Sequence, residues 1–164
     1  MDRVAHPFDP VVNKRCHTLI LGSFPSVKSR ENAFYSGHPQ NRFWKVLAAV
    51  FGEEVPADIP AKKALLLRHG LALWDVIASC EIEGSSDASV KNAVPVDIAQ
   101  VTAIAPVRRV ICNGGLAAKL YRKHLQPLTG IEALTAPSTS PANAAWSQDR
   151  LTEAWRTLLA EEEA

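Results

Sequence analysis

The sequence predicts an α/β fold of three layers, in which helices cover both faces of a central, mainly parallel four-stranded sheet. Short apolar runs alternate along the chain with amphipathic helical stretches, which is typical of this class. The apolar runs are nearly continuous, as expected for strands that are buried on both faces. A chain of 164 residues can bury a substantial core, and we expect residues 1–164 to form one domain.

Four apolar stretches are predicted to be the strands of this sheet. They cover residues 17–22, 71–78, 108–112 and 131–135. A polar stretch between residues 80 and 93 contains glycine and several serines, and it is predicted to be a loop.

Five helices are predicted between and after these strands, at residues 41–51, 58–69, 95–105, 115–124 and 147–160. In the first, apolar residues recur at spacings of three and four. In the second, Asp58 is a suitable N-cap, Pro60 lies in the first turn and Gly70 ends the helix. Pro106 ends the third helix.

Each predicted strand is followed by a polar loop. These loops cover residues 22–40, 79–93, 113–115 and 136–145. Because the carboxyl ends of parallel strands share one edge of a sheet, all four loops should converge on one crevice there. The sequence therefore predicts a single functional site at this edge.

Composition excludes several classes of protein. Apolar residues make up 47% of the chain, but no apolar run approaches the ~20 residues of a membrane span. The N-terminal residues show no apolar signal segment, so a cytoplasmic protein is expected. The three cysteines, Cys16, Cys80 and Cys112, form no CxxC pair, which argues against a zinc site or an iron–sulfur cluster.

The net charge is only +1, but basic residues gather in two places. Residues 1–52 contain seven Lys and Arg against three Asp and Glu, and residues 119–124 hold a second cluster. Two interpretations stay open: a surface that contacts a nucleic-acid backbone, or an ordinary solvated face.

Three polar segments stand out in the sequence, at residues 22–26, 38–45 and 138–143, and each lies in or next to one of the predicted loops. Their residues and their order resemble the uracil-DNA glycosylase superfamily, and its hypoxanthine-DNA glycosylase branch (DNA-deoxyinosine glycosylase, family 6) most of all. Gly22-Ser23-Phe24-Pro25-Ser26 stands where the superfamily has its first motif. His38-Pro39-Gln40-Asn41-Arg42-Phe43-Trp44-Lys45 is similar to a segment shared with mismatch-specific uracil glycosylases. Ser138-Thr139-Ser140-Pro141-Ala142-Asn143 resembles the second motif, which enters DNA beside the target nucleotide.

The resemblance implies a catalytic role for Asn41, although a helix N-cap is an alternative for this residue. Most of the superfamily has Asp or Asn where this chain has Phe24, and a phenyl ring cannot orient or deprotonate water. The usual mechanism therefore cannot be carried over intact. The main chain of Gly22, Ser23 and Phe24 could still hold a water molecule or the base.

The resemblance also implies residues that hold the base. Asp75 stands where the superfamily places its base-reading Asn, but a structural ion pair or backbone hydrogen bond is an alternative for this carboxylate. Either Phe34 or Tyr35 could stack on the base, and the spacing to His38 favours Tyr35, although packing in the core is an alternative for either ring.

A further group of residues is expected to contact DNA: Ser138, Ser140, Pro141, Asn143 and Asn113. Asn113 and the two glycines after it begin a helix whose free N–H groups could hold a phosphate, although an ordinary turn explains them equally well.

The function implied is that of a monofunctional DNA glycosylase in base excision repair, acting on hypoxanthine in deoxyinosine without a cofactor or a metal. The expected partner is DNA containing deaminated bases, with no membrane association, and the protein is expected to be a monomer. Two alternatives remain: excision of uracil, and a catalytically inactive binder of DNA or nucleotides on the same fold.

Overall fold

A four-stranded parallel sheet lies at the centre of the computed structural model, which describes residues 2–5, 9–23, 42–82, 91–140 and 143–160. The sheet has the order β3-β2-β6-β7. Its strands are β2 (Thr18–Gly22), β3 (Leu71–Asp75), β6 (Arg109–Asn113) and β7 (Ala133–Ala136). All three pairings are parallel, which confirms the predicted fold class.

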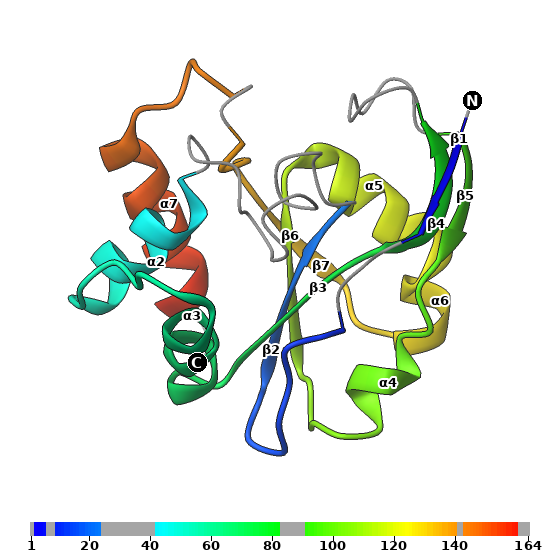
Figure 1. Ribbon diagram of the computed structural model, residues 1–164, viewed down its shortest axis with the longest axis horizontal. Coiled ribbons are helices and arrows are strands. Elements are labelled where there is room, and N and C mark those ends of the chain that lie inside the picture. Colours follow the sequence, from blue (N-terminus) through cyan, green and yellow to red (C-terminus); the bar gives the residue numbers. More distant parts are fainter. Residues whose placement is uncertain (1, 6–8, 24–41, 83–90, 141–142, 161–164) are drawn as a thin grey trace.

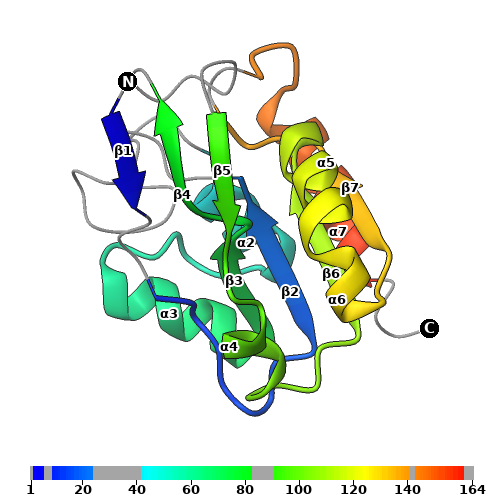
Figure 2. The same cartoon turned by 90° about the vertical axis from the view of Figure 1, so that its right-hand side faces the viewer.

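Helices lie on both sides of this sheet, as Figures 1 and 2 show. One side is covered by α2 (Phe43–Phe51), α3 (Ile59–Arg68) and α7 (Gln148–Ala160). On the other side lie α4 (Ala99–Thr102), α5 (Gly115–His124) and α6 (Gln126–Thr129).

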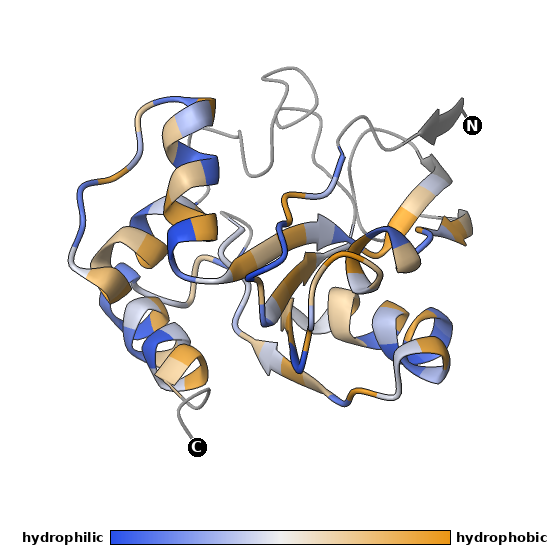
Figure 3. Cartoon of the chain, turned by 90° about the horizontal axis from the view of Figure 1, so that it is seen from below, coloured by the Kyte–Doolittle hydropathy of each residue, from blue (hydrophilic) through white to orange (hydrophobic). Residues whose placement is uncertain are grey.

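The core forms between these layers because the strands are apolar on both faces. Leu19, Ile20 and Leu21 of β2 are almost fully buried. Figure 3 shows the central strands largely in the hydrophobic colour, whereas the helices are banded with both colours. On the α2 side, Phe43 packs edge-on against Trp155 of α7, with the ring centroids 5.9 Å apart.

A second, antiparallel sheet was not predicted. It has the order β1-β4-β5 and consists of β1 (Asp2–Ala5), β4 (Ile77–Ile82) and β5 (Lys91–Pro95). The predicted strand 71–78 therefore divides at Val76, where the chain leaves the parallel sheet and enters β4. The predicted loop 80–93 was wrong at both ends, which are strands.

The predicted helix at residues 95–105 was also wrong in extent. Pro95 ends β5, where it pairs with Ile77, and the regular helix is only α4. Val96, Ile98 and Val101 are buried as the helical pattern required, but Ile104 is 48% exposed. An apolar pattern split between a strand end and a turn of helix was interpreted as one helix.

Two helix starts bear on the site. Asp58 caps α3 as predicted, because its side chain accepts a hydrogen bond of 2.8 Å from the N–H of Ala61. The N-cap of α2 is Arg42, and its side chain makes no capping bond. The capping alternative for Asn41 would require the helix to begin one residue earlier.

Candidate functional site

The carboxyl ends of the four parallel strands bring one residue from each strand into a row. Gly22 pairs with Asp75, and Asn113 pairs with Ala136. Because Leu21 pairs with Cys112, the next residues along, Gly22 and Asn113, are also neighbours. Strands lie ~4.8 Å apart, so the row from Asp75 to Ala136 spans ~14 Å.

Asp75 and Gly22 form the tightest contact in this row. The carboxyl of Asp75 leans over Gly22 so closely that a Cβ atom on residue 22 would stand 2.3 Å from Oδ1 of Asp75. Asp75 is only 7% exposed although it is a carboxylate. Residue 22 must therefore be glycine to make room for the Asp75 side chain.

Asn113, at the end of β6, is bound to the loop that follows β7. Its Nδ2 donates to Oγ1 of Thr139 at 3.0 Å, and its Oδ1 accepts from the N–H of Thr139 at 3.1 Å. Both halves of the amide are thus used, and Thr139 itself is fully buried. The side chain of Asn113 holds this loop in place, so any phosphate contact here would use the main chain at the start of α5.

Gly114 allows the loop to approach the start of α5. Its φ of +95° is one that residues with a side chain rarely adopt, and a Cβ atom there would meet Cβ of Ser138 at 3.2 Å. The N–H of Gly114 donates to the carbonyl of Ala136 at 2.9 Å. The glycine therefore permits both the backbone turn and the contact between the two segments.

A cavity of about 650 Å³, open to solvent, lies between the start of α5 and the loop after β7. It is lined by residues from these two segments: Gly114, Gly115, Thr135, Ala136, Pro137, Ser138, Ser140, Asn143 and Trp146. Its volume lies within the range of small-molecule sites, ~300–1,000 Å³. Three of the predicted DNA-contacting residues, Ser138, Ser140 and Asn143, meet at this cavity.

Arg42 joins the start of α2 to the same loop. Its Nη1 donates to the carbonyl of Trp146, and its Nη2 donates to the carbonyls of Asn143 at 2.9 Å and Ser140 at 3.4 Å. The N–H of Arg42, which follows Asn41 in the chain, donates to the carbonyl of Thr139 at 3.1 Å. The structure thus places the end of the His38–Lys45 segment beside the second motif, as one shared site requires.

The loop is braced further from within and from α7. Nδ2 of Asn143 donates to the carbonyl of Ser138 at 2.9 Å, and Oγ of Ser138 accepts from the N–H of Ser140 at 3.1 Å. Nε1 of Trp155 in α7 donates to the carbonyl of Pro137 at 3.1 Å. These bonds set the direction in which the loop leaves the sheet.

Several predicted site residues lie outside the described residues: Phe24, Phe34, Tyr35, His38, Asn41 and Pro141. Of the others, Gly22 and Asp75 lie together at one end of the row, next to Ser23, whose carbonyl accepts from the N–H of Ile77. Asn113, Ser138, Ser140 and Asn143 lie together at the other end. Both ends of the predicted loop 79–93 are strands of the antiparallel sheet, β4 and β5, and residues 83–90 lie outside the described residues.

Sequence reasoning missed Arg42 and Trp146. Arg42 belongs to the His38–Lys45 segment, but nothing in a single sequence shows that the partners of its guanidinium are carbonyl groups some 100 residues away. Trp146 is partly buried against the core and also lines the cavity, and the guanidinium of Arg150 lies 4.2 Å from the centre of its ring.

Other chemistry near the row is limited. Burial raises the pKa of the Cys112 thiol to about 12, against the opposing charge of Arg122, so this thiol stays protonated at neutral pH. Across the described residues, His, Cys, Asp and Glu side chains form no group of three that could hold a metal ion. Within the same residues, none of the helices has the length and apolar character needed to cross a membrane.

Comparison with known proteins gives a consistent result. Residues 10–159 match the family model of the uracil DNA glycosylase superfamily. Two curated proteins named hypoxanthine DNA glycosylase are similar to this chain along most of its length. The one from Methanosarcina acetivorans is 33% identical over 153 residues, which is 93% of this chain and 96% of that protein. The one from Methanosarcina barkeri is 30% identical over 137 residues, covering 83% and 86%.

Among solved structures, one similar fold is the NMR solution structure of a Methanosarcina acetivorans protein whose assignment as a uracil DNA glycosylase is provisional. The TM-score is 0.77 and the sequences are 31% identical, with 96% of this chain and 97% of that chain covered. The central parallel sheet and its helices are thus shared over nearly the whole chain.

Proposed function

Because this chain belongs to the uracil DNA glycosylase superfamily, we propose that it is a monofunctional DNA glycosylase that removes hypoxanthine from deoxyinosine. The observation that carries the choice of base is the similarity to two proteins named hypoxanthine DNA glycosylase, one of them 33% identical over 93% of this chain. The reaction is hydrolysis of the N-glycosidic bond, which leaves an abasic site in DNA.

The target bond is inaccessible inside a duplex, so the nucleotide must first be extruded into the protein. Cleavage proceeds through a sugar with oxocarbenium character, as in glycoside hydrolysis generally. The C1′–N9 bond breaks and the base departs with the bonding electron pair. Water then adds at C1′ and loses a proton, which balances the charge of the departed base. The protein accelerates this step through hydrogen bonds to the departing base, in a site that is fixed before the substrate arrives.

In this proposal Asp75 recognises the base. A carboxylate accepts from an N–H, and hypoxanthine presents N1–H beside its O6 atom. The position of Asp75 supports this role, because the carboxyl is held over Gly22 at the edge of the sheet where the superfamily binds its base. The carboxylate cannot donate to O6, so a backbone N–H or another donor must serve that oxygen.

Asn41 is proposed as the main catalytic residue, and Tyr35 as the ring that stacks on the base. Both lie outside the described residues. The role of Asn41 rests on the motif that ends at Lys45, and that of Tyr35 on its spacing to His38. The loop with Ser138, Ser140 and Asn143 is proposed to enter DNA beside the extruded nucleotide. Its support is Arg42, the residue directly after Asn41, which donates hydrogen bonds to the carbonyls of Thr139 and Asn143 in that loop.

A cleavage panel tests the proposal. Purified protein is incubated with duplex and single-stranded oligonucleotides that carry inosine, uracil or no lesion, and alkali then reveals abasic sites. We expect cleavage at inosine in the wild type and much less in the Asn41→Ala variant. DNA binding without abasic product on any lesion would refute the enzyme and support an inactive binder.

Uracil excision is the second candidate. It is favoured by the His38–Lys45 segment, which resembles mismatch-specific uracil glycosylases, and by the description of the structural neighbour from Methanosarcina acetivorans. The same panel separates the two substrates, because the ratio of initial rates on inosine and uracil gives the preference directly.

A further inference from the structure

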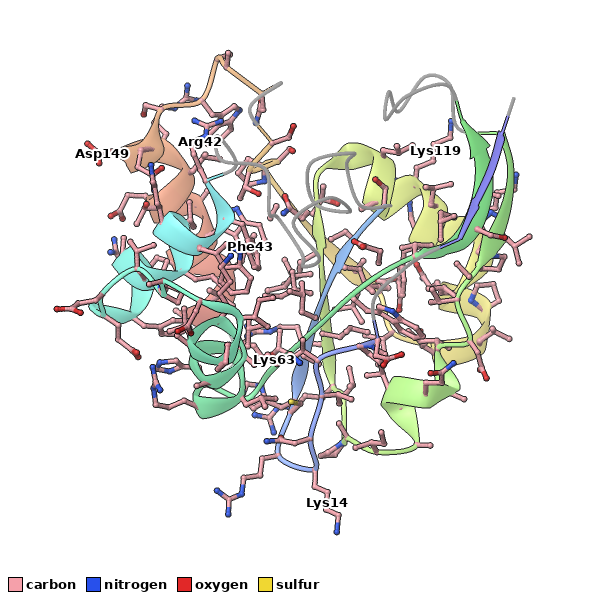
Figure 4. The ribbon with its side chains drawn as sticks, viewed as in Figure 1. Lys14, Arg42, Phe43, Lys63, Lys119 and Asp149 are labelled. Carbon is pink, nitrogen blue, oxygen red and sulfur yellow. The ribbon has the colours of Figure 1, made fainter. Side chains whose placement is uncertain are left out.

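Arg42 makes more bonds to the loop after β7 than the start of a helix requires. Its guanidinium reaches three carbonyls, those of Ser140, Asn143 and Trp146. Figure 4 shows the Arg42 side chain at the start of α2, beside the connection that leads to α7. A planar guanidinium with five donors suits such a set of acceptors, whereas a lysine ammonium acts as a point charge.

The two ends of this connection are held by different side chains. Those of Asn113 and Trp155 bind the first part, at Thr139 and Pro137. The side chain of Arg42 binds the later part, at Ser140, Asn143 and Trp146. The later part includes residues that line the cavity, so Arg42 controls one wall of it.

The start of α2 is itself firmly attached, which makes it a suitable support. Phe43, the next residue, is 1% exposed and packs on Trp155. The N–H of Arg42 also bonds to the carbonyl of Thr139, so main chain and side chain act together. The guanidinium is not needed for capping, because the N-cap position shows no side-chain cap bond.

We propose that Arg42 is a positioning residue, which fixes the proposed DNA-entering loop relative to the start of α2, directly after Asn41 in the chain. Three hydrogen bonds from the guanidinium go to carbonyls of the protein, so we assign its main role to the loop, and the salt dependence of duplex binding tests separately for a phosphate contact. The part of the test that measures excision rates rests on the proposed function. The positioning of the loop can be measured without substrate, by hydrogen exchange.

The test compares Arg42→Ala and Arg42→Lys with a matched control, Arg109→Ala. Arg109 is also bound to carbonyls, those of Leu158 at 2.6 Å and Leu159 at 3.2 Å. It lies at the opposite end of β6 from the site. Loss of Arg109 should therefore lower thermal stability and leave single-turnover excision unchanged at temperatures well below unfolding.

For Arg42, single-turnover excision of hypoxanthine from duplex should fall by roughly 10²-fold, the scale of a ~1 Å misplacement. Excision from single strands should fall less. Arg42→Lys should be as impaired as Arg42→Ala, and the dependence of duplex binding on salt should keep its slope, because no phosphate contact is lost.

Exchange of backbone amide hydrogens tests the positioning of the loop without any substrate. The N–H groups of Asn143 and Trp146 donate to the carbonyls of Ser140 and Asn143, both of which Arg42 also binds. In both Arg42 variants these amides should exchange faster, while those of the α5 helix keep their wild-type rates.

The inference is overturned if Arg42→Lys excises at the wild-type rate, or if Arg109→Ala loses as much activity as Arg42→Ala. It is also overturned if the slope of duplex affinity against salt concentration falls by about one in the Arg42 variants, or if amide exchange in the loop is unchanged. Should the wild type release no base from any lesion, the proposed function fails, and the exchange experiment alone decides the role of Arg42.

Discussion

Replacing Gly22 by alanine moves the proposed base-reading carboxylate without removing it. The new Cβ atom would lie 2.3 Å from Oδ1 of Asp75, whereas ordinary contacts begin at 3.4 Å, so the oxygen must withdraw by about 1 Å. The Cγ atom of Asp75 would lie 3.5 Å from the new Cβ atom, which is an ordinary contact distance. The clash therefore acts on the carboxylate oxygen, the atom that would accept from the base.

The magnitude follows from two costs. Forcing the Asp75 side chain off its preferred rotamer costs about 0.5–1.5 kcal/mol. A buried carboxylate that loses a hydrogen-bonding partner costs about 1–3 kcal/mol more. We expect the free energy of unfolding to fall by about 1.5–4.5 kcal/mol in Gly22→Ala, the sum of the two costs, and excision of hypoxanthine to fall by roughly 10- to 100-fold.

The control is the same substitution in an Asp75→Ala background, where the clashing oxygen is absent. Gly22 lies in a strand and its φ is not positive, so alanine fits the backbone. In this background Gly22→Ala should be neutral, or stabilise by about 0.5–1 kcal/mol because glycine weakens a strand. The free energy of unfolding in urea is measured for the wild type, the two single variants and the double variant. Single-turnover kinetics on inosine and uracil measure the activity of the same four proteins.

Two results would refute this reasoning. A Gly22→Ala protein with the wild-type rate on inosine and the wild-type ratio between inosine and uracil would show that the Asp75 carboxylate does not read the base. If Gly22→Ala lowers the free energy of unfolding as much in the Asp75→Ala background as in the wild type, the clash between the new Cβ atom and the Asp75 carboxylate is not the cause of the loss.

Three further predictions concern other parts of the chain. Asn41→Ala should slow base release by roughly 10²–10³-fold with DNA binding retained, and near-normal single-turnover rates would contradict a catalytic role. Replacing both Ser140 and Asn143 by alanine should weaken binding to damaged duplex, measured by anisotropy, more than it slows excision from single strands. Arg68, with the histidine after it, lowers the pKa of Glu53. Glu53 therefore stabilises the fold above its usual pKa of 4.5, and this contribution is lost as pH falls through the lowered value. The thermal stability gap between wild type and Glu53→Gln, at most ~1 kcal/mol at neutral pH, should close in acid.

The fold of the central sheet could be predicted because its strands are buried on both faces. Their continuous apolar runs are separated by helices with clear signals, such as the Asp58 cap confirmed in the structure. The antiparallel sheet could not be predicted in the same way. Val76 and Ile77 are as apolar as β3, so no change of composition marks the point where the chain passes from one sheet to the other.

The site was predicted in outline for a topological reason. Strand order and direction place Asp75, Gly22 and Asn113 at one edge, whatever their side chains do. The bonds among them could not be predicted, because they depend on backbone carbonyls and on distances between segments far apart in sequence. Gly22 illustrates this limit: the sequence presents it as part of a turn, whereas the structure shows that it makes room for a carboxylate.

In the proposed function, the row at the sheet edge separates two tasks of the enzyme, recognition of the base and entry into the duplex. Asp75 stands at one end of the row and Ala136 at the other, ~14 Å away by strand spacing. Ala136 is followed by the loop that Arg42 holds. Sites more than ~7–10 Å apart with no shared partner act almost independently. Changes at Asp75 should therefore alter the preference between bases and leave duplex affinity intact, whereas changes in the loop should do the reverse. Arg42 is the exception, because it holds the loop and directly follows the proposed catalytic Asn41. Changes at Arg42 should therefore affect both duplex binding and excision.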